Sequence, residues 1–165
     1  MLLLSCRKPV STNTPAGNNK STEEQLVEVN RILVKKDRQK ITGYINRKGW
    51  NMMETETGLW YEILEEGSGD SAKSGQLATM EYTVRLLDGT ICYTSNKNSP
   101  KTFLIGKGNV ESGIEQGVLL LKEGTKARFI LPPYLAHGLP GDGDKIPARS
   151  IIIYELELLS LTNPQ

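Results

Sequence analysis

The side chains that could do chemistry gather in one loop. Residues 132–150, PPYLAHGLPGDGDKIPARS, contain His137, the only histidine of the chain, and four of its eight prolines. Loops longer than about 12–15 residues are uncommon inside a compact domain and are usually functional or disordered. This loop also carries apolar and aromatic side chains: Tyr134, Leu135, Leu139 and Ile146. They are too many for a disordered linker, so we expect the loop to form one wall of a binding site.

Covalent catalysis and metal chemistry have little support in the sequence. It contains no nucleophile–base spacing and no phosphate-binding loop. Asp142 and Asp144, in the segment GDGDK, could bind a cation, but a calcium site needs about 6–8 oxygen ligands, and the spacing lacks a full set. We expect a turn there instead. The two cysteines, Cys6 and Cys92, form neither a disulfide framework nor a metal-ligand spacing. We therefore expect no metal and no cofactor.

Composition indicates one globular domain with some additional sequence. The 165 residues carry a formal net charge of +1, and 38% of them are hydrophobic and 24% charged, as in ordinary globular proteins. Lysine and arginine are scattered along the chain, without the basic and aromatic stripe of a nucleic-acid-binding protein. No apolar run approaches the roughly 18 residues of a membrane-spanning helix. We therefore expect no nucleic-acid partner.

Residues 22–48 carry the signals of a helix. Ser21 or Thr22 serves as its N-cap, and an acidic or amide side chain three residues later completes a capping box. Acidic residues near the start and basic residues near the end complement the helix dipole, and Gly49 is a suitable stop. The polar centre, KKDRQK, is compatible with one long helix or with two helices and a hinge. The helix either packs on the following domain or serves as a dimerisation arm.

From Leu59 onward the sequence changes to short strand-like runs. Asp88-Gly89 is a hairpin signal, and ESGIEQGVLLLKEG is the only helical pattern in this half of the chain. One alternating set in the last run, IIIYELELLSL, is uniformly apolar or aromatic and should face the core: Ile152, Tyr154, Leu156 and Leu158. About five strands and one short helix predict an α+β domain with an antiparallel sheet wrapped around the helix.

The chain opens with MLLLSC, in which three leucines and a small residue precede Cys6. This resembles the lipobox of bacterial lipoproteins, whose cysteine is acylated and becomes the mature N-terminus. A complete signal peptide has an apolar region of about 7–15 residues, so a chance cysteine in an apolar N-terminus is the alternative. Residues 7–21 are polar and rich in proline and glycine, and we expect a flexible tether there. We expect a cell-envelope protein that is lipid-anchored, with its domain in the periplasm, at the outer rather than the inner membrane.

Four segments within residues 58–161 keep the order and spacing of one family: GSGDSAKSGQLATMEYTVRLLDGT, FLIGKGNVESGIEQGVLLLKEGTKARFILPP, AHG and IPARSIIIYELELL. They resemble the FKBP-type peptidyl-prolyl cis-trans isomerases. With its lipobox-like start, leading helix and PPYLAHGL, the whole chain resembles the lipoprotein FKBPs of Bacteroidetes, which include gliding-motility-associated isomerases. The resemblance implies a half-barrel, a curved antiparallel sheet around a helix at 113–121. The chain then divides into a lipobox-like start and tether (1–21), an N-terminal helical extension (22–57) and an isomerase domain (58–165).

The resemblance implies rotation about an X–Pro bond, in which no covalent bond breaks. The barrier, about 18–20 kcal/mol, arises from amide resonance. A dry apolar pocket removes the water that stabilises the planar, polar amide, and a suitable shape favours the twisted form. We expect an isomerase that assists the folding of extracytoplasmic proteins. The alternative is a non-catalytic FKBP-like binding module or chaperone that holds proline-containing or unfolded polypeptides in the same groove.

The resemblance also assigns the residues of the pocket. Catalytic contacts are expected from four residues: Tyr82, Phe103, His137 and Tyr154. Substrate-binding contacts are expected from six others: Cys92, Tyr93, Val110, Glu111, Ile114 and Ile146. The pocket lies between the sheet, the helix and the loop 132–150, so the loop would be a flap over a proline-binding site.

Several of these positions depart from the family pattern. Ile114 stands where the pocket floor is usually Trp, Cys92 where a Phe is usual, and Tyr93 where an Asp is usual. Glu111 replaces an apolar residue whose backbone N–H contacts the substrate. His137 replaces a Tyr that donates to a substrate carbonyl, and a neutral imidazole has one N–H for that purpose. These departures favour the binding module, whereas the dependence of catalysis on pocket shape favours the enzyme.

Overall fold

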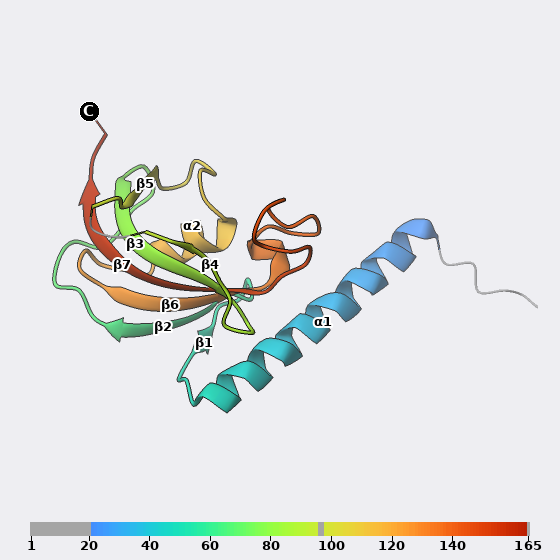
Figure 1. Cartoon of the computed structure of the whole chain (residues 1–165). Coiled ribbons are helices and arrows are strands. Elements are labelled where there is room, and N and C mark those ends of the chain that lie inside the picture. Colours follow the sequence, from blue (N-terminus) through green and yellow to red (C-terminus); the bar gives the residue numbers. More distant parts are fainter. Residues whose placement is uncertain (1–20, 96–97, 165) are drawn as a thin grey trace, which may run out of the picture.

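The computed structural model describes residues 21–95 and 98–164. They form a curved antiparallel β-sheet, with one short helix inside its curve and one long helix outside it (Figure 1). This confirms the predicted α+β class with an N-terminal helical extension. Cys6 and nearly all of the predicted tether lie outside the described residues, so lipid attachment stays a prediction.

Seven strands form the sheet in the described part of the chain: β1 (Met53–Glu54), β2 (Trp60–Glu65), β3 (Leu77–Leu86), β4 (Ile91–Thr94), β5 (Lys101–Leu104), β6 (Lys126–Leu131) and β7 (Ile152–Thr162). Their order is β1-β2-β6-β7-β3-β4, and β5 also pairs with β3. All pairings are antiparallel. The sequence predicted about five strands, because a strand as short as the two-residue β1 shows no alternation that could be recognised.

Strand β7 is central to the sheet, because it pairs with both β6 and β3. Its four residues predicted to face the core are buried, with relative exposures between 0% and 5%: Ile152, Tyr154, Leu156 and Leu158. The predicted hairpin at Asp88-Gly89 joins β3 to β4, and Gly89 adopts a positive φ of 93°. Local signals were therefore sufficient to place the longest strand and one turn.

Helix α2 (Ser112–Val118) approaches the concave face of the sheet closely. A Cβ atom on Gly117 would lie 2.8 Å from the ring of Phe129, and one on Gly113 would lie 2.6 Å from the Leu131 side chain. Only glycine at these positions lets the helix backbone rest on the core side chains of β6. The helix thereby brings Glu111 and Ile114 to the concave side of the sheet.

The helix is shorter than the predicted 113–121, because the chain tightens after Val118. The N–H of Leu121 donates to the carbonyl oxygen of Val118, three residues earlier, at 3.0 Å. This turn buries Leu121, which is 1% exposed, and leaves Leu119 and Leu120 about half exposed. Helical periodicity alone could not show that the core needs Leu121 at a different angle.

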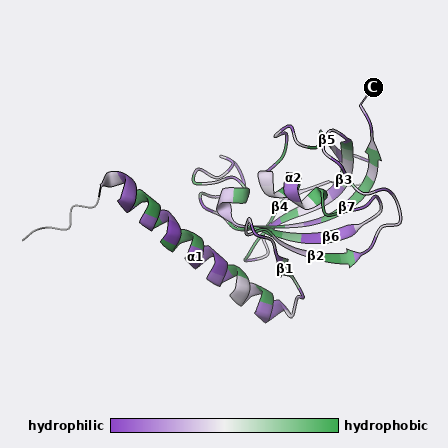
Figure 2. Ribbon diagram, turned by 180° about the vertical axis from the view of Figure 1, so that it is seen from behind, coloured by the Kyte–Doolittle hydropathy of each residue, from purple (hydrophilic) through white to green (hydrophobic). Residues whose placement is uncertain are grey.

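Helix α1 (Thr22–Lys48) is one continuous helix, so the alternative of two helices and a hinge is wrong. Ser21 and Glu24 form the predicted capping box, and Gly49 ends the helix in the left-handed conformation. Its C-terminal half packs on the convex face of the sheet through Ile41 and Tyr44. Its N-terminal half projects away from the domain (Figures 1 and 2). Five apolar side chains there are exposed: Leu26, Val27, Val29, Ile32 and Val34.

A buried ion pair joins the middle of α1 to the end of the flap. Arg149 Nη2 lies 2.6 Å from Asp37 Oδ2, and the Asp37 side chain is only 7% exposed. Arg149 adopts a positive φ of 55°, and its backbone N–H donates to the carbonyl oxygen of Gly138. Through Arg149, the helix therefore holds the end of the flap against Gly138, the residue that follows His137. Neither helix of the described residues is long and apolar enough to cross a membrane.

Candidate active site

The flap, residues 132–150, is organised by its own side chains. It begins with a single 3₁₀ turn at Pro133–Leu135. The carboxylate oxygen Oδ1 of Asp142 accepts hydrogen bonds from the backbone N–H groups of Asp144 and Ile146, at 2.9 and 2.8 Å. This is the turn expected from GDGDK, and it uses Asp142 to shape the loop. Among the described residues, no group of three or more His, Cys, Asp or Glu side chains could hold a metal ion.

Strand β4 is tied to the flap by Tyr93. The Tyr93 hydroxyl donates to Asp142 Oδ2 at 2.5 Å and lies 3.3 Å from Asp144 Oδ2. The hydrogen bond to Asp142, together with burial, raises the pKa of Tyr93 to about 12. Burial acts to raise the pKa of Asp142, but the bonds from Tyr93 and from two backbone N–H groups outweigh it and lower that pKa to about 2. The Asp142 carboxylate thus reaches β4 from the flap and meets it at Tyr93. The FKBP pattern described above usually has an Asp at this strand position.

Cys92, the neighbour of Tyr93, is a buried strand residue. It is 3% exposed, and its Sγ lies 3.6 Å from the carbonyl oxygen of Lys145. Burial, followed by the charges of Asp142 and Asp88, raises the pKa of the thiol. A thiol with a raised pKa is a poor nucleophile, so Cys92 contributes packing beneath the flap.

Four predicted pocket residues converge into one apolar floor. They come from α2, the flap, β7 and β5, and their relative exposures lie between 0% and 3%: Ile114, Ile146, Tyr154 and Phe103. The ring of Tyr82 lies against this floor, with its centroid 5.7 Å from that of Tyr154. Segments far apart in the sequence therefore supply adjoining apolar surfaces, as the proposed chemistry requires.

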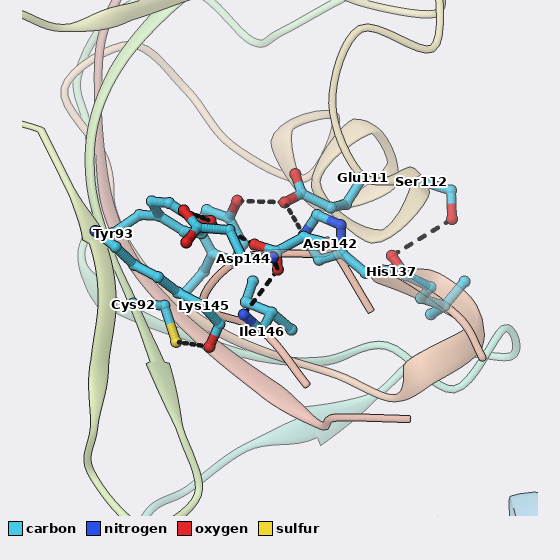
Figure 3. A network of polar contacts seen from close by, with 11 residues as sticks. Cys92, Tyr93, Glu111, Ser112, His137, Asp142, Asp144, Lys145 and Ile146 are labelled. Carbon is cyan, nitrogen blue, oxygen red and sulfur yellow. Dashed lines mark hydrogen bonds and ion pairs between the residues drawn. The ribbon is translucent and has the colours of Figure 1, made fainter. Parts of the chain in front are cut away.

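Glu111 bridges two walls above this floor. Its Oε1 accepts a hydrogen bond from the Tyr154 hydroxyl at 2.8 Å and lies 3.0 Å from His137 Nε2. Figure 3 shows Glu111 and His137 turned toward each other, with Asp142 beside them. Burial, and next the charge of Glu111, raise the pKa of Tyr154. The other carboxylate oxygen, Oε2, is buried and has no hydrogen-bond partner among the described residues.

This bridge changes the role available to His137. A neutral imidazole has a single N–H, and here Nε2 is directed at Glu111. When the imidazole N–H is on Nε2, it faces the Glu111 carboxylate and not a substrate carbonyl. The hydroxyl of Tyr82 makes no hydrogen bond to another described residue, and Tyr82 is only half buried. The Tyr82 hydroxyl is therefore available as a donor.

A cavity of about 350 Å³ lies at the mouth of the site, lined by Lys101, Gly108, Asn109, Val110, Glu111, Ala136 and His137. Three of the predicted residues line it, namely Val110, Glu111 and His137. Phe103 does not, because it is buried in the core. The sequence analysis missed Lys101, whose ammonium group lies 5.9 Å from the Tyr82 ring centroid. The signal was present, since Lys101 lies two residues before Phe103 in a strand and such residues share a face.

Comparison with known proteins identifies the family. The family model for FKBP-type peptidyl-prolyl cis-trans isomerases matches residues 69–159. The chain belongs to this family. Among curated FKBP-type relatives, a probable isomerase, FkpA, from Neisseria meningitidis is 37% identical over 112 residues, which cover 67% of this chain and 40% of the relative. FK506-binding protein 2 from Yarrowia lipolytica is 34% identical over 68% of this chain and 78% of the relative.

Solved FKBP-type structures share the fold. The crystal structure of AtFKBP13 superimposes with a TM-score of 0.64 at 30% sequence identity, covering 67% of this chain and 98% of that one. A peptidyl-prolyl cis-trans isomerase from Pseudomonas syringae pv. tomato gives a TM-score of 0.68 at 25% identity, covering 89% of this chain and all of that one. The chain spans less than half the length of its FkpA relatives, 40% of the one from Neisseria meningitidis and 44% of one from Aeromonas hydrophila.

Proposed function

We propose that this FKBP-type chain is a peptidyl-prolyl cis-trans isomerase that assists the folding of extracytoplasmic proteins. The observation that carries the proposal is the convergence of Tyr82, Tyr154, Ile114 and Ile146 from four separate segments into one apolar surface. Such a surface excludes water from an X–Pro amide. The family membership and the absence of any need for a cofactor in this chemistry point the same way.

Catalysis would depend on desolvation and shape. Water stabilises the planar, charge-separated amide, so an apolar wall lowers the barrier to twisting by withholding that stabilisation. A wall that fits the twisted amide better than the planar one adds preferential binding of the transition state. The Tyr82 hydroxyl, which has no other partner among the described residues, would donate to a substrate carbonyl at the rim. Lys101 and Asn109 make the mouth of the cavity polar, which suits the exposed backbone of a bound peptide.

We propose a cellular placement from the first residues of the chain. The MLLLSC start supports acylation at Cys6, and residues 7–21 supply a tether to a periplasmic domain at the outer membrane. This arrangement would resemble that of the Bacteroidetes lipoprotein FKBPs. Mass spectrometry of the membrane-extracted protein tests it, because acyl chains add a defined mass at Cys6. An unmodified Cys6 in that fraction would refute lipid attachment.

The exposed apolar half of α1 supports a homodimer. Its five exposed apolar side chains, between Leu26 and Val34, are 43–63% exposed, and burying them against a second copy would remove them from water. Light scattering of the full chain tests this, with Ile32→Glu as the disrupting variant. A monomer at all concentrations would refute it.

A second candidate function is that of a binding module or chaperone. A groove of about 210 Å³ between α1 and the flap is lined partly by apolar side chains: Leu33, Val34, Pro133, Tyr134 and Leu139. Leu139 is 67% exposed. The groove could hold an unfolded client without any isomerisation, so binding and catalysis have to be measured separately.

The deciding experiment measures cis-trans exchange of a short X-Pro peptide by NMR. We expect wild type to accelerate exchange and Tyr82→Phe to lower kcat/KM by about two- to tenfold, since one lost hydrogen bond is worth about 0.5–1.5 kcal/mol. Tyr82→Ala should lower it further. Tyr61→Phe, at a hydroxyl on the β2 strand outside the site, is the matched control and should match wild type. Phe103→Ala is expected to destabilise the core by about 3–5 kcal/mol. The melting temperature of this variant must therefore be measured as well, so that a loss of activity is not confused with unfolding.

Two results would change the proposal. Exchange that is accelerated by wild type and left intact by Tyr82→Ala would reject the pocket described here. Peptide binding without any acceleration would select the binding module.

A further inference from the structure

The apolar floor of the site is closed to solvent. Ile114, Ile146 and Tyr154 are 0%, 2% and 2% exposed. A proline ring that reaches these side chains must have an entrance, yet the cavity at the mouth ends on Val110, Glu111 and His137. Some part of this lining therefore has to move when a substrate binds.

We propose that Glu111 is a side-chain gate over the proline subsite, and that the structure shows the gate closed. The inference rests on the proposed isomerase function, because it concerns access to that same pocket. The carboxylate spans the entrance, with Oε1 held by Tyr154 of β7 on one side and by His137 of the flap on the other. Figure 3 shows Glu111 lying between α2 and the flap. Productive binding requires this bridge to break.

The gate can open without unfolding its surroundings. Glu111 is the N-cap residue of α2, but its side chain makes no capping hydrogen bond. Only its backbone carbonyl oxygen supports the helix, by accepting from the N–H groups of Ile114 and Glu115. Rotation of the side chain therefore leaves α2 intact.

The closed position is also poorly satisfied. A carboxylate has about four acceptor sites, and in the closed position the whole oxygen Oε2 is buried without a partner among the described residues. Leaving such an atom unpaired is costly. Opening returns Oε2 to water or to the cation in the cavity lining, Lys101. This gain partly offsets the loss of the Tyr154 hydrogen bond and of the His137 contact, so the open position stays accessible.

A gate of this kind acts on apparent affinity. If only the open fraction of molecules accepts proline, the apparent dissociation constant equals the intrinsic one divided by that fraction. Removing the gate should therefore lower KM more than it raises kcat. A carboxylate that merely shaped the site would give the opposite sign, because its loss would weaken binding.

The test compares four proteins in the NMR exchange assay and in peptide-binding calorimetry. Glu111→Ala removes the gate, and Tyr154→Phe removes one of its two latches while keeping the ring. Glu111→Gln keeps the length and an oxygen that accepts from both latches. Glu66→Ala, at a carboxylate paired with Lys122 outside the site, is the control for loss of one negative charge. Thermal melts of all variants separate gating from changes in folding.

We expect Glu111→Ala to lower KM at least tenfold, equivalent to about 1.4 kcal/mol, with Tyr154→Phe in between and Glu111→Gln nearer to wild type. An unchanged or higher KM for Glu111→Ala, in a variant that melts like wild type, would overturn the gate while leaving the isomerase proposal standing. Tighter peptide binding by Glu111→Ala without catalysis in any protein would support the gate and refute the isomerase. Neither tighter binding nor catalysis would refute both.

Discussion

Replacing Asp37 by alanine should loosen the contact between α1 and the flap. The Asp37 carboxylate is 7% exposed and lies 2.6 Å from Arg149 Nη2, while the Arg149 side chain is 30% exposed. Removing one member of a fully buried pair costs about 3–5 kcal/mol, because the other charge is left uncompensated. Here the guanidinium can turn to water, so we take the lower value for a charge-assisted hydrogen bond, about 1.5–3 kcal/mol.

The assay is thermal and denaturant unfolding of the full chain. At about 4 °C per kcal/mol for a domain of this size, Asp37→Ala should lower the melting temperature by about 6–12 °C. The matched control is Arg31→Ala on the same helix, whose partner is Glu28 at 2.9 Å and whose side chain is 77% exposed. Exposed pairs of this kind contribute little to stability because water screens them, so the control should melt close to wild type.

The same perturbation should reach the active site. Arg149 is bonded through its backbone N–H to Gly138, the residue after His137. Without Asp37 the flap should close over the peptide less often, so we expect KM to rise while kcat changes little. Equal melting temperatures for Asp37→Ala and Arg31→Ala would refute the reasoning, because a buried pair and an exposed one would then contribute alike.

The remaining predictions concern packing and titration. Gly117→Ala should destabilise the domain by about 1–3 kcal/mol, measured by denaturant unfolding, because the added Cβ would lie 2.8 Å from the Phe129 ring; an unchanged midpoint would contradict the close approach. In an NMR titration the Asp142 carboxyl should titrate with a pKa of about 2 in wild type and higher in Tyr93→Phe, since the hydroxyl bond is lost. Because the folded pKa is lowered from 3.8, Asp142 stabilises the fold above about pH 4 and that contribution disappears as the pH falls through about 2. Tyr93, whose pKa is raised from 10.0 to about 12, stabilises the fold below about pH 10 and loses that contribution as the pH rises through about 12.

The sequence alone determined the features that depend on neighbours along the chain. The capping box at Ser21 and the stop at Gly49 define α1 by local hydrogen bonds. The alternation from Ile152 to Leu158 identifies which side of β7 is buried, since side chains in a strand alternate between its two faces. The motifs in residues 58–161 indicated the FKBP-type fold, and the pocket positions they assign stay a prediction.

Tertiary structure decided which distant side chains meet. Neither the Asp37–Arg149 pair, separated by 112 residues, nor the meeting of Glu111 with Tyr154 and His137 has a local signal. The sequence predicted His137 as a donor to substrate, which stays a prediction, and the fold adds a contact with no local signal, from its Nε2 to Glu111 Oε1 at 3.0 Å. Hydrogen bonds between side chains depend on positions within a few tenths of an ångström, and such positions are set only when the sheet, α2 and the flap pack together.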